Sequence, residues 1–178
     1  MVKTADVVII GGGIIGLSIA YYLTLKKAGK IVLFEKGQLG EGSTSRCVGG
    51  IRTQFSTEIN IRFSLESLKV FEQFKEEFGV NPEFKRIGYL FLATTEGEMQ
   101  IFKQNVRLQK KFNLPVELLS PDEIQERWPY LRMDDILGGT FCSWDGYAGP
   151  SEVLSGFAGP AALTTLEVKI SSPFVLTL

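Results

Sequence analysis

Apolar and polar stretches alternate from the start of the chain in a way that predicts a strand, a helix and a second strand. Val7–Ile10 and Ile31–Phe34 are short apolar runs rich in β-branched residues, as buried parallel strands are. The stretch between them begins with glycines and continues with apolar residues at helical spacing. We therefore predict a helix from about Ile14 to Ala28-Gly29. Its buried face is expected to consist of Ile15, Ile19, Tyr22 and Leu23.

Further helices are marked by residues that begin or end helices. Thr57 and Gly79 bound an amphipathic stretch, and Thr95 with Glu98 three residues later forms a capping-box pattern, as does Ser120 before a proline. The predicted helices cover residues 58–78, 96–112, 121–128 and 151–157, the last interrupted by Gly159-Pro160. The predicted strands cover 84–93 (most clearly 88–93), 115–119, 138–143, 166–170 and 174–178, and 145–147 is predicted to be a turn.

The glycines after the first strand follow the GxGxxG pattern of dinucleotide-binding turns. Gly11 allows a sharp turn out of the strand, Gly13 lets the backbone approach a pyrophosphate, and Gly16 lets the helix pack closely on the strands. The first amides of the helix lack intrahelical partners and lie at the positive end of its dipole. The sequence therefore predicts a pyrophosphate at this turn, against the alternative of a glycine-rich turn with no ligand.

Glu35 ends the second apolar run, where the same pattern places an acid. Its carboxylate can accept hydrogen bonds from ribose hydroxyls and would repel a 2′-phosphate, so NADP is disfavoured. From these residues alone, an NAD-binding domain remains an alternative to an FAD-binding one.

Residues 37–50 are too polar and too rich in glycine for a strand, and they form a long connection for a compact domain. The hydroxyls of Ser43, Thr44 and Ser45 and the fixed charge of Arg46 suit a phosphate group. A flexible surface loop is the alternative interpretation. Because the loop follows a complete dinucleotide pattern, we expect it to contact the ligand.

Composition excludes several classes of function. A chain of 178 residues can form one domain, or one domain with part of another. A net charge of −1 gives no reason to expect a nucleic acid or a charged membrane surface as partner. No apolar run approaches the roughly 20 residues of a membrane span, and Met1 precedes the first strand so closely that no signal peptide is expected. The two cysteines make neither a metal motif nor a disulfide framework, so a reducing, cytoplasmic location is expected.

The chain contains no histidine. This removes the commonest general base, the serine–histidine and cysteine–histidine nucleophile pairs, and most zinc sites. If the protein is an enzyme, we expect a cofactor to supply the chemistry.

Several stretches together resemble one family. They are Val7–Gly16, the Glu35-Lys36 pair, the loop Gly42–Arg52, Gly88–Leu92, and Asp145-Gly146-Tyr147 with Pro150. From about Val2 to Phe157 the chain is similar to the first part of the D-amino-acid oxidase/glycine oxidase family of FAD-dependent oxidoreductases. Within it, the chain most resembles sarcosine oxidase β subunits and β subunits of dye-linked L-proline dehydrogenase.

The resemblance implies which residues contact FAD. By position, Gly11, Gly13, Ile14, Ile15 and Gly16 would hold the pyrophosphate, and Glu35 with its neighbour Lys36 would hold the adenosine ribose region. Ser43, Thr44, Ser45 and Arg46 would lie along the stretch from phosphate to flavin, and Gly49, Gly50 and Ile51 would approach the isoalloxazine. Arg52 would lie beside the substrate as the candidate catalytic residue, and Cys47 is expected to be a plain loop residue.

The fold implied is α/β, with a Rossmann-like FAD-binding domain and the start of an α+β substrate domain built on an antiparallel sheet. The expected boundaries are 1–83 for the FAD-binding part, 84–143 for a partial substrate domain, and 144–178 for a return to the FAD domain with an atypical tail. Family members are about twice as long and continue differently after Phe157, so a truncated chain is expected.

The function implied is oxidation of an amino acid or secondary amine, such as proline, sarcosine or glycine, by hydride transfer to flavin N5. The expected partners are that small molecule and other subunits of a hetero-oligomer. The alternative is a non-catalytic fragment that binds FAD, or its ADP half, and needs a second half. Because strands of a divided sheet lack neighbours, the isolated chain is expected to be marginally stable without such a partner.

Overall fold

The computed structural model describes residues 4–161 and 166–170, and these form two compact units. Unit 1 takes the described residues of Met1–Gly49, Gln73–Glu83 and Ala148–Leu178, and unit 2 takes Gly50–Glu72 and Phe84–Tyr147. The expected boundary after residue 83 coincides with a change from unit 1 to unit 2, but residues 50–72, expected in the FAD-binding part, belong to unit 2, which extends to Tyr147 instead of 143. Hydrogen bonds from Thr53 and Gln54 to Asp145 tie this segment to unit 2, and sequence order does not reveal them.

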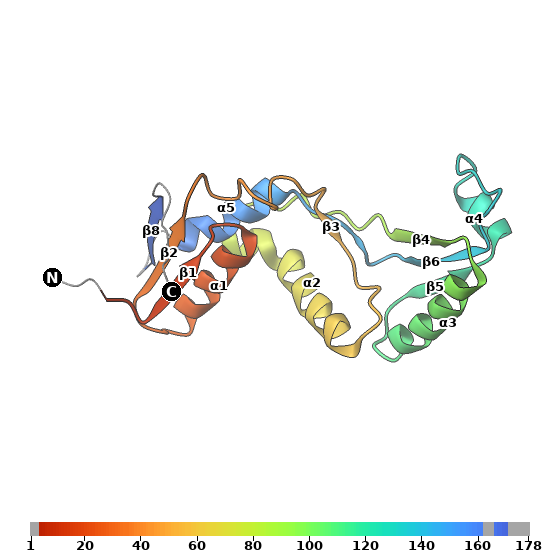
Figure 1. Cartoon of the computed structure of the whole chain (residues 1–178), viewed down its shortest axis with the longest axis horizontal. Helices are drawn as coiled ribbons and strands as arrows, with labels where there is room; N and C mark the ends of the chain where they lie inside the picture. The colour runs from red at the N-terminus through yellow and green to blue at the C-terminus, as the bar shows by residue number, and fades with distance from the viewer. Residues whose placement is uncertain (1–3, 162–165, 171–178) are drawn as a thin grey trace. The chain divides into compact units, whose positions relative to one another are not determined.

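The elements follow in the order shown in Figure 1. The helices are α1 (Ile14–Leu25), α2 (Glu58–Phe78), α3 (Glu96–Lys110), α4 (Pro121–Arg127) and α5 (Pro150–Ala161). The strands are β1 (Val7–Ile10), β2 (Ile31–Glu35), β3 (Gly50–Ile51), β4 (Tyr89–Ala93), β5 (Val116–Leu119), β6 (Gly138–Cys142), β7 (Gly146–Tyr147) and β8 (Leu166–Ile170). None of the helices in the described part of the chain is long and apolar enough to cross a membrane.

Unit 1 contains a parallel sheet of order β1-β2-β8. Val7 pairs with Ile31, and Ile31 pairs in turn with Leu166. The predicted strands at 7–10, 31–34 and 166–170 are thus confirmed, and 174–178 lie outside the described residues. The central strand β2 begins with three buried residues, as expected for a strand with neighbours on both sides.

Aromatic rings form much of the core of unit 1. The ring of Phe157 on α5 lies 4.7 Å from Phe78, 5.5 Å from Phe74 and 5.7 Å from Tyr21, measured between centroids. The Tyr21 hydroxyl donates a 2.7 Å hydrogen bond to Glu77. Burial, with this hydrogen bond second, raises the pKa of Tyr21 to about 12. These contacts join α1, the end of α2 and α5 into one packed layer.

The buried face predicted for α1 is wrong. Ile15, Ile19 and Tyr22 are 70%, 46% and 38% exposed, and Leu23 is only half-buried. The residues that α1 buries are Gly16, Leu17, Ala20 and Tyr21. Small residues at two of these positions let α1 approach the strands closely, and the helix is apolar on nearly all sides, so periodicity could not select the packed face.

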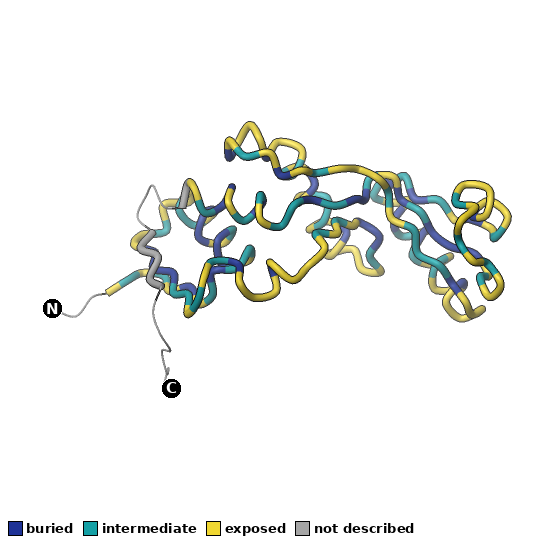
Figure 2. The backbone as a smooth tube through the Cα atoms, turned by 90° about the horizontal axis from the view of Figure 1, so that it is seen from above, coloured by how far each residue is buried: buried dark blue, intermediate teal, exposed yellow. Residues whose placement is uncertain are grey.

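Unit 2 is built on an antiparallel sheet of order β4-β6-β5, with α3 packed against it (Figure 1). Its core includes Ile61 on α2, Val106 on α3 and Cys142 on β6, each nearly or fully buried. The connecting loops of this unit are mostly exposed (Figure 2). The antiparallel sheet expected from the family resemblance is therefore present.

A second, two-stranded sheet in unit 2 joins β3 and β7, with Gly50 opposite Tyr147 and Ile51 opposite Gly146. The prediction of a turn over residues 145–147 is therefore wrong for 146 and 147. Two residues are too few to show the alternating pattern of a strand. They form a strand only because they pair with β3. A Cβ on Gly146 would overlap the carbonyl oxygen of Lys85, so the close approach requires glycine.

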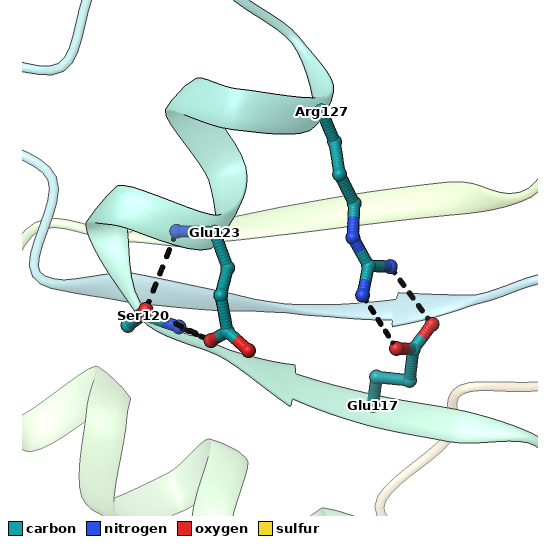
Figure 3. A network of polar contacts seen from close by, with 4 residues as sticks. All are labelled: Glu117, Ser120, Glu123 and Arg127. Atoms are coloured by element: carbon teal, nitrogen blue, oxygen red, sulfur yellow. Dashed lines mark hydrogen bonds and ion pairs between the residues drawn. The ribbon is translucent and has the colours of Figure 1, made fainter.

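Both predicted capping boxes are confirmed. Ser120 accepts a hydrogen bond from the Glu123 amide, and the Glu123 carboxylate accepts one at 2.8 Å from the Ser120 amide (Figure 3). Thr95 and Glu98 form the same arrangement at the start of α3. At the end of α4, Arg127 donates two hydrogen bonds, of 2.8 and 3.0 Å, to the two oxygens of Glu117 on β5 (Figure 3). This fork fixes α4 against the sheet.

Several helices and strands begin or end at other residues than predicted. Helix α3 ends at Lys110 instead of about Phe112, and strand β4 begins at Tyr89 instead of Phe84. The interruption predicted at Gly159-Pro160 is wrong, because α5 continues to Ala161.

Candidate functional site

Unit 1 contains a cavity of about 1050 Å³ at the carboxyl ends of β1 and β2. The start of α1 and the loop over residues 36–47 complete its walls. In open parallel sheets, this end of the strands is where ligands bind. The lining residues are Ile9, Ile10, Gly11, Gly13, Ile14, Ile15, Gly16, Ile19, Glu35, Lys36, Gly37, Gly40, Glu41, Gly42, Ser43, Thr44, Arg46 and Cys47.

Geometry requires glycine at two positions of the turn, Gly11 and Gly16, and leaves little room beside Gly13. Gly11 has a φ of +105°, a conformation that residues with a side chain rarely adopt. A Cβ on Gly16 would overlap the carbonyl oxygen of Gly11, so only glycine lets α1 begin this close to the turn. A Cβ on Gly13 would lie 3.2 Å from the Thr44 hydroxyl and would narrow the cavity.

The first residues of α1 line the cavity, and their amides lack partners within the helix. The first i→i−4 hydrogen bond of the helix runs from Leu17 to Gly13 at 3.0 Å, so the amides before it have no intrahelical partner. One of them, at Ile14, donates to Thr44 Oγ1 at 3.1 Å. The first turn contains no acidic residue. This combination leaves positive partial charge for an anionic ligand.

Glu35 lines the same cavity, and two other amides hold its carboxylate. Its Oε2 accepts a 2.7 Å hydrogen bond from the Gly12 amide, and its Oε1 accepts a 2.9 Å bond from the Gly37 amide. The Gly37 amide, with the Gly12 amide second, lowers the pKa of this carboxyl. The group is therefore anionic at neutral pH, and each oxygen has a further lone pair for a ribose hydroxyl.

Charged groups of both signs lie at the rim. Lys36 and Arg46 line the cavity and are exposed, and no described carboxylate forms an ion pair with either. Glu41 also lines it, with its carboxylate accepting a 2.9 Å bond from the Gln38 amide. The cations are available to a phosphate, while Glu41 is engaged within its own loop.

The structure brings together most of the residues predicted to bind the cofactor, all along this cavity. They are Gly11, Gly13, Ile14, Ile15, Gly16, Glu35, Lys36, Ser43, Thr44 and Arg46.

Five predicted site residues do not line the cavity. Ser45 turns away, with its hydroxyl donating to the Glu41 carbonyl, and lines a smaller cavity of about 240 Å³ in the same unit. Gly49 accepts a hydrogen bond from the Ala148 amide through its carbonyl. Gly50, Ile51 and Arg52 belong to unit 2.

Some residues of the cavity were missed. They are Ile9, Ile10, Ile19, Gly37, Gly40, Glu41, Gly42 and Cys47. Cys47, expected to be a plain loop residue, lines the cavity and donates through its thiol to the Thr44 carbonyl at 3.1 Å. The apolar pattern of Ile9 and Ile10 predicts only a buried strand, and it is their position at the carboxyl end of β1 that puts them on the cavity.

The residues present fit the ADP part of a dinucleotide. The amides at the start of α1 suit a pyrophosphate, Glu35 suits a ribose, and the volume is ample. Among the described residues, no group of three histidine, cysteine, aspartate or glutamate side chains is placed to hold a metal ion.

Comparison with known proteins agrees with this geometry. The profile of the family described as FAD dependent oxidoreductase matches residues 6–170. The match continues past Phe157, where the sequence resemblance was expected to end, and it includes β8. The stretch from Ala158 to Ile170 is thus part of the family pattern.

The relatives are longer than this chain. Mitochondrial dimethylglycine dehydrogenase of Rattus norvegicus is 33% identical over 170 residues, which cover 95% of this chain and 20% of that protein. Sarcosine oxidase subunit beta of an Arthrobacter species is 32% identical over 166 residues, covering 89% of this chain and 41% of the relative. The crystal structure of L-proline dehydrogenase from P. horikoshii matches with a TM-score of 0.81 and 35% identity, over 96% of this chain and 45% of that one.

Proposed function

Because this chain belongs to the family of FAD-dependent oxidoreductases, we propose that it takes part in oxidising an amino acid or a secondary amine with FAD bound in the cavity of unit 1. FAD is the cofactor of the family, which decides against the NAD-binding alternative. The substrates that we propose are small, of the proline, sarcosine or glycine type. The names of the similar proteins support this choice, since they include a proline dehydrogenase and a sarcosine oxidase subunit.

One observation carries the proposal: the amides at the start of α1 and the Glu35 carboxylate line the same cavity. The amides bind the pyrophosphate through their N–H groups, and Glu35 accepts hydrogen bonds from the ribose. Arg46 and Lys36 supply positive charge at the rim. When bound, FAD supplies the acceptor for a hydride from the carbon next to the substrate nitrogen.

We further propose that Arg52 binds the carboxylate of the substrate. Its guanidinium lies 4.7 Å from the ring centroid of Phe55 and 5.7 Å from that of Phe91. Stacking on two rings restricts the side chain while its N–H groups remain free for a carboxylate. The protein's contribution to catalysis is then orientation of the substrate, and the absence of histidine is compatible with this.

A second candidate is an FAD-binding chain that turns over only with a partner subunit. In the described residues, β1 pairs with β2 alone, and on β1 Val8 and Ile10 are 56% and 69% exposed. Such an apolar strand with a free edge favours association. The name sarcosine oxidase subunit beta also indicates a multi-subunit relative.

The absorbance spectrum of the purified protein tests both candidates. We expect a yellow protein that releases flavin on denaturation and is bleached anaerobically by proline, sarcosine or glycine. Bound flavin that none of these reduces would favour the second candidate. A colourless protein that takes up no FAD in titration would overturn the proposal.

A further inference from the structure

Arg52 lies in an irregular segment of unit 2, between the end of β3 and the start of α2. Irregular segments usually run over the surface, where water satisfies their backbone groups. Here Thr53 is fully buried and Gln54 is 8% exposed, whereas Arg52 itself is exposed. Because buried backbone groups need hydrogen-bond partners, another part of unit 2 has to provide one next to Arg52.

The carboxylate of Asp145 provides that partner. Asp145 is fully buried, and its Oδ1 accepts hydrogen bonds from the Thr53 amide at 2.7 Å and from the Thr53 hydroxyl at 2.6 Å. Its Oδ2 accepts a hydrogen bond from Gln54 Nε2 at 3.0 Å. The Thr53 amide belongs to the planar peptide group that joins Arg52 to Thr53, so the first of these bonds fixes the backbone directly after Arg52.

The residue that follows Asp145 fixes the backbone directly before Arg52. Gly146 on β7 pairs with Ile51 on β3. The turn that carries Asp145 is itself attached to the start of β4, because the Gly88 amide donates to the Asp145 carbonyl at 2.8 Å. Two consecutive residues therefore hold the chain on both sides of Arg52.

Two further hydrogen bonds hold the later part of the segment. Gln54 Nε2 also donates to the Tyr89 carbonyl on β4 at 2.9 Å, and Gln109 Nε2 on α3 donates to the Phe55 carbonyl at 3.0 Å. Neither bond replaces the one from Asp145 to the peptide group ahead of them.

A buried carboxylate is a costly way to hold a segment. Moving such a group out of water costs several kcal/mol, and burial accordingly raises the pKa of Asp145. Buried ionisable groups of this kind occur preferentially at functional sites. The position of the Arg52 side chain indicates what Asp145 is needed for.

The guanidinium of Arg52 lies over two aromatic rings. Its distance is 4.7 Å to the ring centroid of Phe55 and 5.7 Å to that of Phe91. Phe55 belongs to the anchored segment, and Phe91 belongs to β4, to which Gln54 is bonded. A shift of the segment relative to β4 would therefore move the guanidinium away from Phe91.

We propose that Asp145 is a positioning residue for Arg52: it holds the segment so that the guanidinium stays over Phe55 and Phe91 and presents its N–H groups to a carboxylate. The proposal deepens the proposed function and rests on it for the ligand of Arg52. A cation that is already held in its binding position loses less conformational freedom when the carboxylate binds, so Asp145 raises the affinity through Arg52.

The NMR signal of the Arg52 Nε–H group in the purified protein tests the proposal, and the variant Arg52→Lys assigns it. Ring currents of Phe55 and Phe91 displace this signal from the position of freely exposed arginines. In Asp145→Ala we expect the signal to return to that position, because all three bonds of the carboxylate are lost. In Asp145→Asn it should move about half as far, because the side-chain NH2 faces a donor where one carboxylate oxygen accepted.

Arg62 is the internal control, because its guanidinium lies 5.1 Å from the ring centroid of Phe112 in the same unit. Its signal should stay unchanged in both variants, and Asp134→Asn, an exposed acid of unit 2, should move neither signal. If Asp145→Ala does not fold, the isosteric Asp145→Asn decides. An Arg52 signal that keeps its wild-type position in Asp145→Asn would overturn the proposal. So would a displacement of the Arg62 signal in that variant, because Asp145 would then hold the whole unit and not Arg52 in particular.

Titration with acetate on the same samples separates this proposal from the proposed role of Arg52. We expect acetate to shift the Arg52 signal saturably in the wild type and to bind at least threefold more weakly to Asp145→Asn. An Arg52 signal that depends on Asp145 but does not respond to acetate supports the positioning and contradicts the carboxylate-binding role. Equal affinity for acetate in wild type and variant contradicts the positioning and leaves that role intact.

Discussion

The Gly12 amide donates a 2.7 Å hydrogen bond to Glu35 Oε2, which joins the glycine turn to the end of β2. The Gly37 amide donates to the other oxygen of the same carboxylate. Together the two bonds hold the glycine turn and the end of β2 in place before any ligand binds. A residue expected to contact only the ribose therefore also has a structural role.

Replacing Glu35 with glutamine should weaken both the fold and FAD binding. The amide group can accept from one backbone N–H but presents a donor to the other, so we expect a loss of about 1–3 kcal/mol in unfolding free energy. FAD affinity should fall at least tenfold. Urea unfolding and flavin titration measure the two effects.

Two controls accompany this variant. Glu41→Gln at the same cavity should leave stability nearly unchanged, because Glu41 is exposed and bonds only within its loop. The pKa of Glu35 is lowered in the fold, so its stabilisation is present above the ordinary glutamate pKa and is lost as pH falls through the lowered value. A difference between wild type and Glu35→Gln that persists in strong acid would contradict this account.

Gly16→Ala should destabilise unit 1 by about 1–3 kcal/mol and prevent FAD binding, because its Cβ would overlap the Gly11 carbonyl oxygen. Gly97→Ala is the matched control. It lies in α3, is exposed, and its added Cβ would meet only the Thr95 hydroxyl at 4.0 Å, so alanine there should stabilise by up to about 1 kcal/mol. Thermal unfolding measures the change in stability of both variants. Equal changes would show that the overlap at Gly16 is relieved.

Thr44→Val keeps the shape of the side chain and removes the acceptor for the Ile14 amide. Thr44 is only 8% exposed, so we expect the loss of a helix cap, about 1 kcal/mol, in urea unfolding of the FAD-free protein. Ser43→Ala, an exposed neighbour, should change stability by less than about 0.5 kcal/mol. If both variants behave alike, Thr44 does not cap α1.

Asp145→Asn should remove a pH dependence of stability. Burial raises the pKa of Asp145, so the group contributes stability below the unfolded aspartate pKa of about 4 that is lost as pH rises through the higher folded value. The difference in unfolding free energy, wild type minus variant, should therefore decrease as pH increases. Asp134→Asn, an exposed acid in unit 2, should change the unfolding free energy by less than about 0.5 kcal/mol at neutral pH. A wild-type advantage that grows with pH would contradict the prediction.

Local sequence signals predicted the parts of the fold that local interactions determine. Ser120 with Glu123 and Thr95 with Glu98 mark helix starts because their bonds span three residues. The glycine turn and the role of Glu35 could likewise be predicted from the sequence, because each position of the pattern has one steric or electrostatic requirement.

Contacts between distant residues explain the errors. The strand at Gly146–Tyr147 exists only through its pairing with Gly50–Ile51. Helix α1 packs on the face that carries Gly16 and Ala20, because these small residues allow the sheet to approach closely. Apolar residues lie on every side of the helix, so the apolar pattern could not identify this face.

The sequence by itself determined the dinucleotide turn, the helix caps and the α/β order of elements, because each depends on residues within a few positions or on one regular spacing. Only the tertiary structure showed that Glu35 is held by the amides of Gly12 and Gly37, and that Asp145 anchors Gln54 beside Arg52 in unit 2. The bonds of Glu35 to Gly12 and of Asp145 to Gln54 join groups that are 23 and 91 positions apart, and no local pattern operates over such a separation.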